Sequence, residues 1–310
     1  MNIHVHSDVQ EALRRNRAVV ALESALTTHG MPYPQNLQIA RQMESAVRAA
    51  GALPATIAII AGRVRVGLTD SELQGLAQSP RPRKVSLRDM AACIVSGEDG
   101  GTTVAATAHI AQRAGILVFV TGGIGGVHRG QPFDVSADLP VLAGTPIAVV
   151  CAGAKSILDL PLTLEWLETH GVPVVGYQTG EFPAFFSRES GLPVDFRADT
   201  VEQVARFAFA HWEMGLRSAV LVGVPVPEEA AVPGELAEEA IRQALADAER
   251  EGIHGKAITP YLLQRTADLS EGQTRRANLA LLVRNAEVGA QLAVAMHRKA
   301  TTKTQGHEEG

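Results

Sequence analysis

A lysine that follows an apolar run is well placed in this sequence for covalent chemistry. The run from Pro146 to Val150 predicts a buried strand, and Lys155 follows it among small residues, at the predicted start of the next helix. In an open α/β sheet, ligands bind beyond the carboxyl ends of the strands. A neutral lysine there can attack a carbonyl or sugar carbon and form a Schiff base. The alternative is a surface lysine at a helix start, and this stretch alone favours that simpler interpretation.

Three carboxylates in the sequence are candidates for metal binding or proton transfer. Asp134 and Asp138, with the hydroxyl of Ser136 between them, could hold a divalent cation through oxygen. Helix capping by an aspartate is the simpler alternative. Glu23 ends an apolar strand predicted over Ala18–Leu22. A carboxylate in that position is either paired structurally or serves as a general acid or base.

Two glycine-rich segments are candidates for holding an anion. Gly100–Thr103 precedes a helix predicted to run to about Arg113, and a helix start favours negative charge. Lys84 could add positive charge, whereas ordinary capping by threonine is the commoner alternative. In Thr121–Gly130 the glycines come as two pairs, which excludes the G-x-G-x-x-G fingerprint. That segment suits a close approach to a ligand and a tight loop without one about equally.

The composition of the whole chain is typical of a globular enzyme. Of its 310 residues 46% are hydrophobic and 20% are charged, and the net charge of −5 argues against a nucleic-acid or anionic membrane surface. The two cysteines lie in apolar segments, which indicates buried thiols in a reducing compartment. The N-terminus lacks the pattern of a signal peptide, and no apolar run reaches the ~18 residues of a membrane span. We therefore expect a cytoplasmic protein.

Predicted strands and helices alternate through much of the chain. This alternation predicts a three-layer α/β/α fold with a mostly parallel central sheet. Short β-hairpin elements are expected as well, one of them over Ala55–Ala61 and Val64–Val66. We expect a single domain over residues 1–298 and a disordered polar tail over 299–310. The main helices are predicted over Gln35–Ala50, Ser156–His170, Thr200–Met214, Glu235–Glu251, Thr259–Ala267 and Gly272–His297.

Several short motifs follow one another along nearly the whole chain. They are Ala21–Ser24, His29–Asn36, Lys84–Ser86, Gly101–Thr107, Thr121–Gly130, Phe133–Leu139, Cys151–Asp159, Glu181–Phe185 and Ala277–Leu281. In this order they resemble the motifs of the pseudouridine-5′-phosphate glycosidase family, which also includes indigoidine synthase A. The resemblance spans roughly residues 18–295.

The resemblance implies an enzyme that reversibly cleaves the C–C glycosidic bond of pseudouridine 5′-phosphate, to uracil and D-ribose 5-phosphate, in pseudouridine catabolism. By matched position Lys155 is the nucleophile, which forms an imine with C1′ of the ring-opened ribose, and Glu23 is the proton donor. Asp134 matches a metal ligand that holds one Mn²⁺ per subunit largely through water. The family is homotrimeric with an α/β/α core. The remaining matches are the substrate contacts Lys84, Thr103, Val104, Ser136, Ala137 and Asp138, the uracil-recognising Asn278, and His128 as a further active-site residue.

Two other functions share part of this pattern. A class I aldolase-like lyase acting on another sugar phosphate would need the lysine but neither the metal nor Asn278. A non-catalytic sensor would bind ribose 5-phosphate without turning it over. The joint presence of Glu23, Asp134 and Lys155 favours the glycosidase. Val224, where the family usually has Asn, and a shortened loop before Asp134 bear on fine substrate preference.

Overall fold

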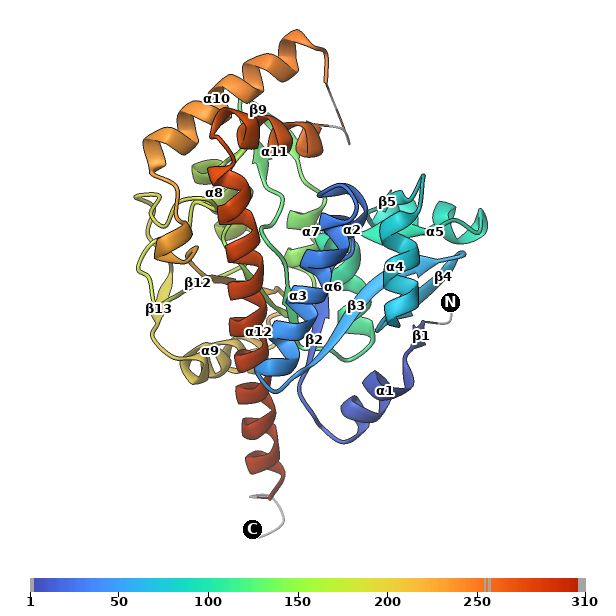
Figure 1. Cartoon of the computed structure of the whole chain (residues 1–310). Coiled ribbons are helices and arrows are strands. Elements are labelled where there is room, and N and C mark those ends of the chain that lie inside the picture. The colour runs from blue at the N-terminus through green and yellow to red at the C-terminus, as the bar shows by residue number, and fades with distance from the viewer. Residues whose placement is uncertain (1–2, 254, 256–257, 306–310) are drawn as a thin grey trace.

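The computed structural model describes residues 3–253, 255 and 258–305, and its elements form three layers (Figure 1). A central sheet of eleven strands lies between two layers of helices. A separate three-stranded sheet is antiparallel. The three-layer fold with a mostly parallel sheet, expected from the alternation of elements, is confirmed.

The order of the strands in the central sheet differs from their order in the chain. Its main path runs through β1 (His4–Val5), β4 (Arg63–Val66), β3 (Leu53–Ile60), β2 (Val19–Leu22), β7 (Val118–Val120), β10 (Ala148–Cys151), β14 (Val220–Gly223), β12 (Val174–Tyr177) and β13 (Phe196–Ala198). All neighbours from β3 to β13 pair in parallel. The predicted hairpin is confirmed as the antiparallel pair β3–β4. Beside it, β6 (Gly100–Thr102) pairs with β3 and with β5 (Arg83–Val85).

Alternate residues of the central strands face the two helical layers. In β7, Val118 and Val120 pack into one hydrophobic cluster and Phe119 into the other, because successive side chains point to opposite faces of a sheet. Strands covered on both faces carry apolar residues at every position, which is why β2, β10 and β14 are so rich in valine.

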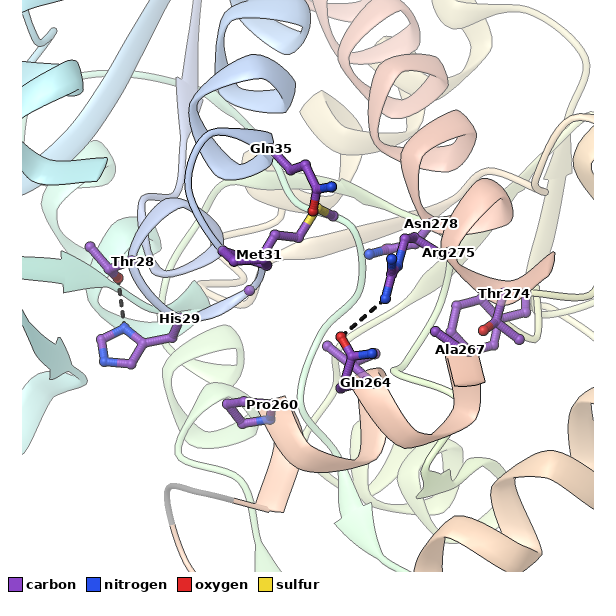
Figure 2. Close-up of a pocket in the computed structure, with 14 residues that line it drawn as sticks. Thr28, His29, Met31, Gln35, Pro260, Gln264, Ala267, Thr274, Arg275 and Asn278 are labelled. Atoms are coloured by element: carbon purple, nitrogen blue, oxygen red, sulfur yellow. Dashed lines mark hydrogen bonds between the residues drawn. The ribbon is translucent and has the colours of Figure 1, made fainter. Parts of the chain in front are cut away.

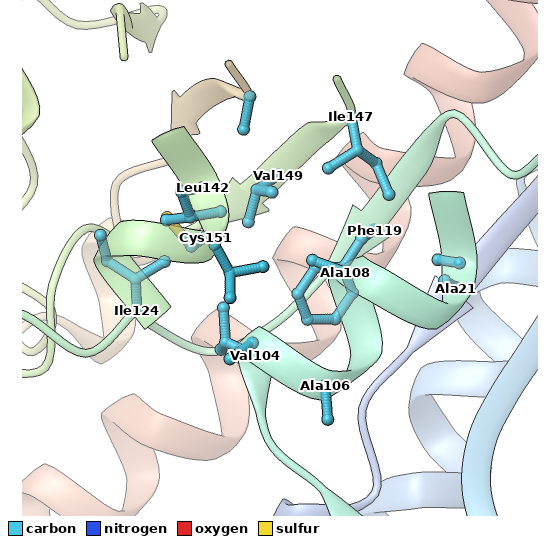
Figure 3. Packing of buried hydrophobic residues seen from close by; sticks show 14 of the residues in the cluster. Ala21, Val104, Ala106, Ala108, Phe119, Ile124, Leu142, Ile147, Val149 and Cys151 are labelled. Atoms are coloured by element: carbon cyan, nitrogen blue, oxygen red, sulfur yellow. The ribbon is translucent and has the colours of Figure 1, made fainter. Parts of the chain in front are cut away.

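Helices lie on both faces of the sheet and at its upper end in the view of Figure 1. The cluster containing Val120 includes residues of α3 (Gln35–Ala49), α9 (Val201–Glu213) and α12 (Gln273–Gln305). The cluster containing Phe119 includes residues of α1 (Ser7–Arg14), α5 (Leu87–Val95), α6 (Val104–Arg113), α7 (Asp138–Ala143), α8 (Leu160–Thr169) and α10 (Gly234–Arg250). Figure 3 shows α6 lying over the strands, with Ala108 beside Phe119. The remaining helices are α2 (Ala25–His29), α4 (Asp70–Gln78), α11 (Ile258–Leu269) and the 3₁₀ turn Glu228–Ala230.

Helix α12 runs along the sheet from the end near α11 to the opposite end of the molecule (Figure 1). It packs against α3, α9, β2, β7 and β10. Within the described residues it alone has the length and composition to cross a membrane, over Gln273–His297, yet 61% of that apolar window is buried inside the protein. Gly289 allows the helix to lie close to β7, since a Cβ at this position would collide with Val120.

One expectation about local structure is corrected, and another stays a prediction. Lys155 does not begin a helix: β11 (Leu158–Asp159) intervenes and pairs with β8 (Val127–His128), which pairs with β9 (Gln131–Val135). Such short strands in glycine-rich sequence lack the periodicity that a prediction needs. The disordered tail expected from residue 299 stays a prediction, and α12 extends as far as Gln305. Residues 306–310 lie outside the described part of the chain.

Substitution of Gly289 by alanine should lower the free energy of unfolding by about 2 kcal/mol, because the new methyl group overpacks a buried contact with Val120. A matched control is Gly75→Ala on α4, where a Cβ meets nothing within 4 Å. That control should gain up to about 1 kcal/mol from helix propensity. Urea denaturation of both variants measures the difference. Equal stability of the two variants would contradict the close packing of α12 on β7.

Candidate active site

Three adjacent parallel strands bring polar residues to one edge of the sheet. Glu23 directly follows β2, Thr121 directly follows β7, and Lys155 lies in the loop after β10. The carboxyl ends of parallel strands meet at the same edge, which is the usual place for a ligand in such a sheet. Pairing of distant segments therefore brings the predicted acid and the predicted nucleophile together.

A cavity of about 80 Å³ lies at this edge, and we call it the inner cavity. Five residues singled out from the sequence line it: Glu23, Lys84, Thr103, Lys155 and Asn278. Its other walls come mainly from α2, the segment around Phe185, α11 and α12. Phe185 is the last residue of the motif Glu181–Phe185. Two lysines and a carboxyl group thus share one small space with mostly apolar walls.

Glu23 is held in an environment that favours its protonated form. Its removal from water raises the pKa of its carboxyl group. Lys155, a hydrogen bond from the Thr121 hydroxyl to Oε1 and Lys84 act in the opposite direction, while Asp138 adds to the increase. The net direction is upward from the ordinary value. A carboxyl group that keeps its proton to higher pH is suited to act as a general acid.

The backbone around Lys155 is fixed on both sides. Its N–H donates to the carbonyl of Ile124 at 3.0 Å, and its own carbonyl accepts from Leu158 N at 2.9 Å. Gly153 has φ +90°, and a Cβ there would collide with the carbonyl oxygen of Pro183. Only glycine fits this left-handed and crowded position. The turn that presents Lys155 is therefore determined by close backbone packing.

The start of α6 contributes Thr103 to the wall of the inner cavity. Thr103 precedes the helix, and its backbone N–H donates to the carbonyl of Val85 at 2.9 Å. Its hydroxyl is buried and has no hydrogen-bond partner among the described residues. Leaving a buried polar group unpaired is costly, so such a group commonly meets a ligand or water. With Lys84 on the adjacent β5, the helix start provides donors and positive charge for an anion.

Asp138 connects the glycine-rich loop to α6. It is buried, and its two carboxylate oxygens accept from Ala105 N at 2.9 Å and Gly125 N at 2.8 Å. A Cβ on Gly125 would collide with the hydroxyl of Ser136, so glycine is required there as well. Neither Ser136, Ala137 nor Asp138 is among the described residues that line the inner cavity. Their predicted contacts with substrate stay predictions.

His128 and Asp134 lie on the small antiparallel sheet and line neither of the cavities described in this section. The Nδ1 atom of His128 lies 3.0 Å from the carbonyl oxygen of Asp134 and 3.4 Å from its Oδ2. The side chain of Asp134 is 66% exposed. Among the described residues there is no group of three His, Cys, Asp or Glu side chains that could hold a metal. The metal ligand therefore stays a prediction from the resemblance.

A second cavity, of about 280 Å³, adjoins the first, and we call it the outer cavity (Figure 2). Asn278 and His29 line both cavities, so the two spaces meet at these side chains. At the rim Arg275 donates to Oε1 of Gln264 at 3.1 Å, which links α12 to α11. No sequence motif pointed to Gln264 or Pro260, because residues on α11 reach the site only through the tertiary fold.

Comparisons with known proteins find relatives over nearly the whole chain. The model of the family described as indigoidine synthase A like protein matches residues 8–295. A protein of Caldanaerobacter subterraneus named pseudouridine-5′-phosphate glycosidase is 51% identical, covering 96% of this chain and 97% of the relative. A protein of Symbiobacterium thermophilum with the same name is 55% identical, covering 93% and 96%.

Two solved structures share the fold over nearly its whole length. The prealnumycin C-glycosynthase AlnA, in complex with ribulose 5-phosphate, superposes with a TM-score of 0.89 at 43% identity, covering 97% of this chain and 98% of that one. An indigoidine synthase A-like protein of Thermotoga maritima superposes with a TM-score of 0.87 at 35% identity, covering 96% and 97%.

The raised pKa of Glu23 predicts that Glu23→Gln stabilises the protein at neutral pH. Below the ordinary pKa of 4.5 the carboxyl is protonated in both the folded and the unfolded state. As the pH rises, the unfolded chain releases this proton first, so the wild type loses stability that the neutral glutamine does not lose. Urea denaturation at pH 4 and pH 7 measures the difference. The exposed control Glu229→Gln should lack this gain, and an equal gain in both variants would contradict the prediction.

Proposed function

The chain belongs to the indigoidine synthase A-like family, and on this basis we propose that it is a pseudouridine-5′-phosphate glycosidase. The observation that carries the proposal is the inner cavity, in which Lys155, Glu23 and Lys84 lie together at the edge of the sheet. The reaction is the reversible cleavage of pseudouridine 5′-phosphate, with water, into uracil and D-ribose 5-phosphate.

Cleavage of a C–C glycosidic bond needs a sink for the electrons of that bond. The neutral amine of Lys155 attacks C1′ while the bond from C1′ to the ring oxygen breaks, and Glu23 gives its proton to that oxygen. The nitrogen lone pair then forms the C1′=N bond as the C–C bond breaks. The electron pair of the C–C bond remains on the uracil carbon, which takes a proton. Water adds to the imine and releases ribose 5-phosphate together with the free lysine.

The phosphate group fits the start of α6. Thr103 offers an unpaired buried hydroxyl, Val104 begins the helix, and Lys84 supplies a positive charge. Binding energy from this remote group would hold C1′ against the amine of Lys155. A similar solved structure contains ribulose 5-phosphate, which supports a phosphorylated five-carbon sugar as the ligand class.

The base fits the junction of the two cavities. Asn278 lines both, and its side-chain amide can donate to and accept from the polar edge of a pyrimidine. The mostly apolar walls near Phe185 and Leu263 suit the faces of a ring. This placement separates the sugar phosphate, in the inner cavity, from the base beside the outer one.

The metal that the resemblance implies fits a hydrated ion held by Asp134. The exposed carboxylate of Asp134 is a hard oxygen donor, the kind that Mn²⁺ and Mg²⁺ accept together with water. His128 adjoins it and could hold the carboxylate in place. When bound, such an ion would supply positive charge that can stabilise an anionic oxygen. The homotrimer and the cytoplasmic location stay predictions.

Lys155→Ala should abolish uracil release from pseudouridine 5′-phosphate, because in the proposed mechanism the amine of Lys155 attacks C1′, whereas Lys84, the other lysine that lines the inner cavity, binds the phosphate. Absorbance of uracil measures release, in the presence of Mn²⁺. Borohydride reduction with ribose 5-phosphate should add the mass of the reduced sugar to the wild type and not to Lys155→Ala. In Lys84→Ala, the matched lysine control, the adduct should still form when the sugar phosphate is saturating.

Other outcomes distinguish the alternatives. If the folded wild type binds ribose 5-phosphate but releases no uracil and forms no adduct, the protein is a sensor and the proposal fails. If an adduct forms with sugar phosphates while pseudouridine 5′-phosphate remains intact, the aldolase-like lyase is favoured.

Asp134→Asn should raise the Mn²⁺ concentration needed for half-maximal activity by roughly tenfold or more, since even indirect partners of a metal change affinity by that factor. Loss of free Mn²⁺ signal in electron paramagnetic resonance measures binding independently of turnover. Asp8→Asn on α1 is the control and should bind Mn²⁺ as the wild type does. Unchanged Mn²⁺ binding by Asp134→Asn would remove this residue from the metal site.

A further inference from the structure

Thr121 is a fully buried residue that directly follows β7 and contacts the proposed acid Glu23. Its hydroxyl donates a hydrogen bond to Oε1 of Glu23. Its backbone N–H donates to the carbonyl of Val150 at 3.0 Å, so β10 fixes its position from one side. A threonine hydroxyl has one proton to donate, and here that proton is directed at a carboxyl oxygen.

Asn285 of α12 fixes the same residue from the other side. Its side-chain Nδ2 lies 2.9 Å from the carbonyl oxygen of Thr121 and 3.4 Å from that of Gly122. Because both acceptors are carbonyls, the amide must present its NH₂ group to them. Asn285 is fully buried, and its Oδ1 has no hydrogen-bond partner among the described residues. Among the described residues, the side chain of Asn285 is therefore hydrogen-bonded only through its Nδ2 atom, to the carbonyl groups of Thr121 and Gly122.

The same stretch of α12 carries residues of the cavity walls. Asn278 lies seven residues before Asn285, about 10 Å along the helix and about two turns away, so both lie near one face. Leu282 lies between them and lines the inner cavity, close above Gly122. One rigid element thus contacts both the proposed base site and the turn that contains Thr121.

We propose that Thr121 is the positioning residue of the acid Glu23 and that Asn285 holds Thr121 in place. The inference rests on the proposed function, in which Glu23 donates the proton. A neutral carboxyl group whose Oε1 accepts from threonine carries its own proton on Oε2. The hydrogen bond from Thr121 therefore selects the oxygen that donates and fixes the orientation of the group.

The groups around Glu23 determine in which direction its pKa should change when the hydroxyl of Thr121 is removed. Lys155 acts on Glu23 from the loop after β10, Lys84 from β5 and Asp138 from the start of α7, and His29 lines the same cavity. The hydrogen bond from Thr121 stabilises the carboxylate, so its removal raises the pKa of Glu23 further. Activity that requires protonated Glu23 falls as the pH passes that pKa. The alkaline limb of the profile should therefore move to higher pH when the hydroxyl is lost.

The decisive pair of variants is Thr121→Val, which keeps the shape and removes the donor, and Thr121→Ser, which restores it. In Thr121→Val, kcat for uracil release should fall about tenfold or more, the scale of one lost hydrogen bond to an ionisable group. KM should stay near the wild-type value, and the alkaline limb of kcat/KM should shift upward. Thr121→Ser should return kcat and the limb toward the wild-type values. A loss of kcat without a shift of the limb would overturn the proposal.

A titration that needs no turnover separates this inference from the proposed function. Carbon-13 spectra of labelled glutamate side chains, with Glu23→Gln for assignment, follow the carboxyl of Glu23 directly. Its pKa should be higher in Thr121→Val than in the wild type and unchanged in Thr121→Ser. If the wild type releases no uracil, the proposed function fails and the titration still decides the contact. An unchanged titration in Thr121→Val would overturn the inference even in an active enzyme.

Asn285 is tested through its dependence on Thr121. Asn285→Leu alone should lower kcat in the same direction as Thr121→Val. In the double variant the effect of Asn285→Leu on kcat should largely disappear, because residues that act through one contact are not additive. Additive losses would show that Asn285 acts independently of Thr121. If Asn285→Leu does not fold, the Thr121 pair decides the proposal without it.

Discussion

The register of three parallel strands determines the rest of the site. Leu22 of β2 and Val150 of β10 both pair with Val120 of β7, so the three strands end at nearly the same level of the sheet. The chain leaves them with Glu23, Thr121 and the loop to Lys155 side by side. A shift of one residue in any strand would turn its side chains to the opposite face. The apolar residues on both faces of the sheet therefore determine where Glu23, Thr121 and Lys155 lie as well as how the core packs.

The sequence predicted those parts of the fold that repeat a simple pattern. Apolar runs such as Ala18–Leu22 and amphipathic stretches such as Gln35–Ala50 are close to β2 and α3 as observed. The short strands β8, β9 and β11 could not be predicted, because two to five residues in glycine-rich sequence carry no periodicity. β11 in addition pairs with β8 only when the loop after β10 meets the segment after β7. The error at Lys155 has this cause.

The site was predictable in its residues more than in its geometry. The motifs drew attention to Glu23, Lys155 and Asn278, and the structure places all three in one cavity. The part played by Thr121 was hidden, since it depends on a hydrogen bond across ninety-eight positions of sequence. Asn285 was hidden in the same way, because it meets the turn only when α12 lies on β7. Such pairings arise from tertiary structure, and no local pattern encodes them.

The position of α12 connects stability with function. Gly289 lets the helix lie on β7, and this close approach places Asn285 within reach of the carbonyl groups after the strand. The same packing helps to enclose the space in which Glu23 is kept from water, and removal from water raises its pKa. An acid held in this way destabilises the folded chain at neutral pH. The large apolar contact of α12 with the sheet adds stability that offsets this loss.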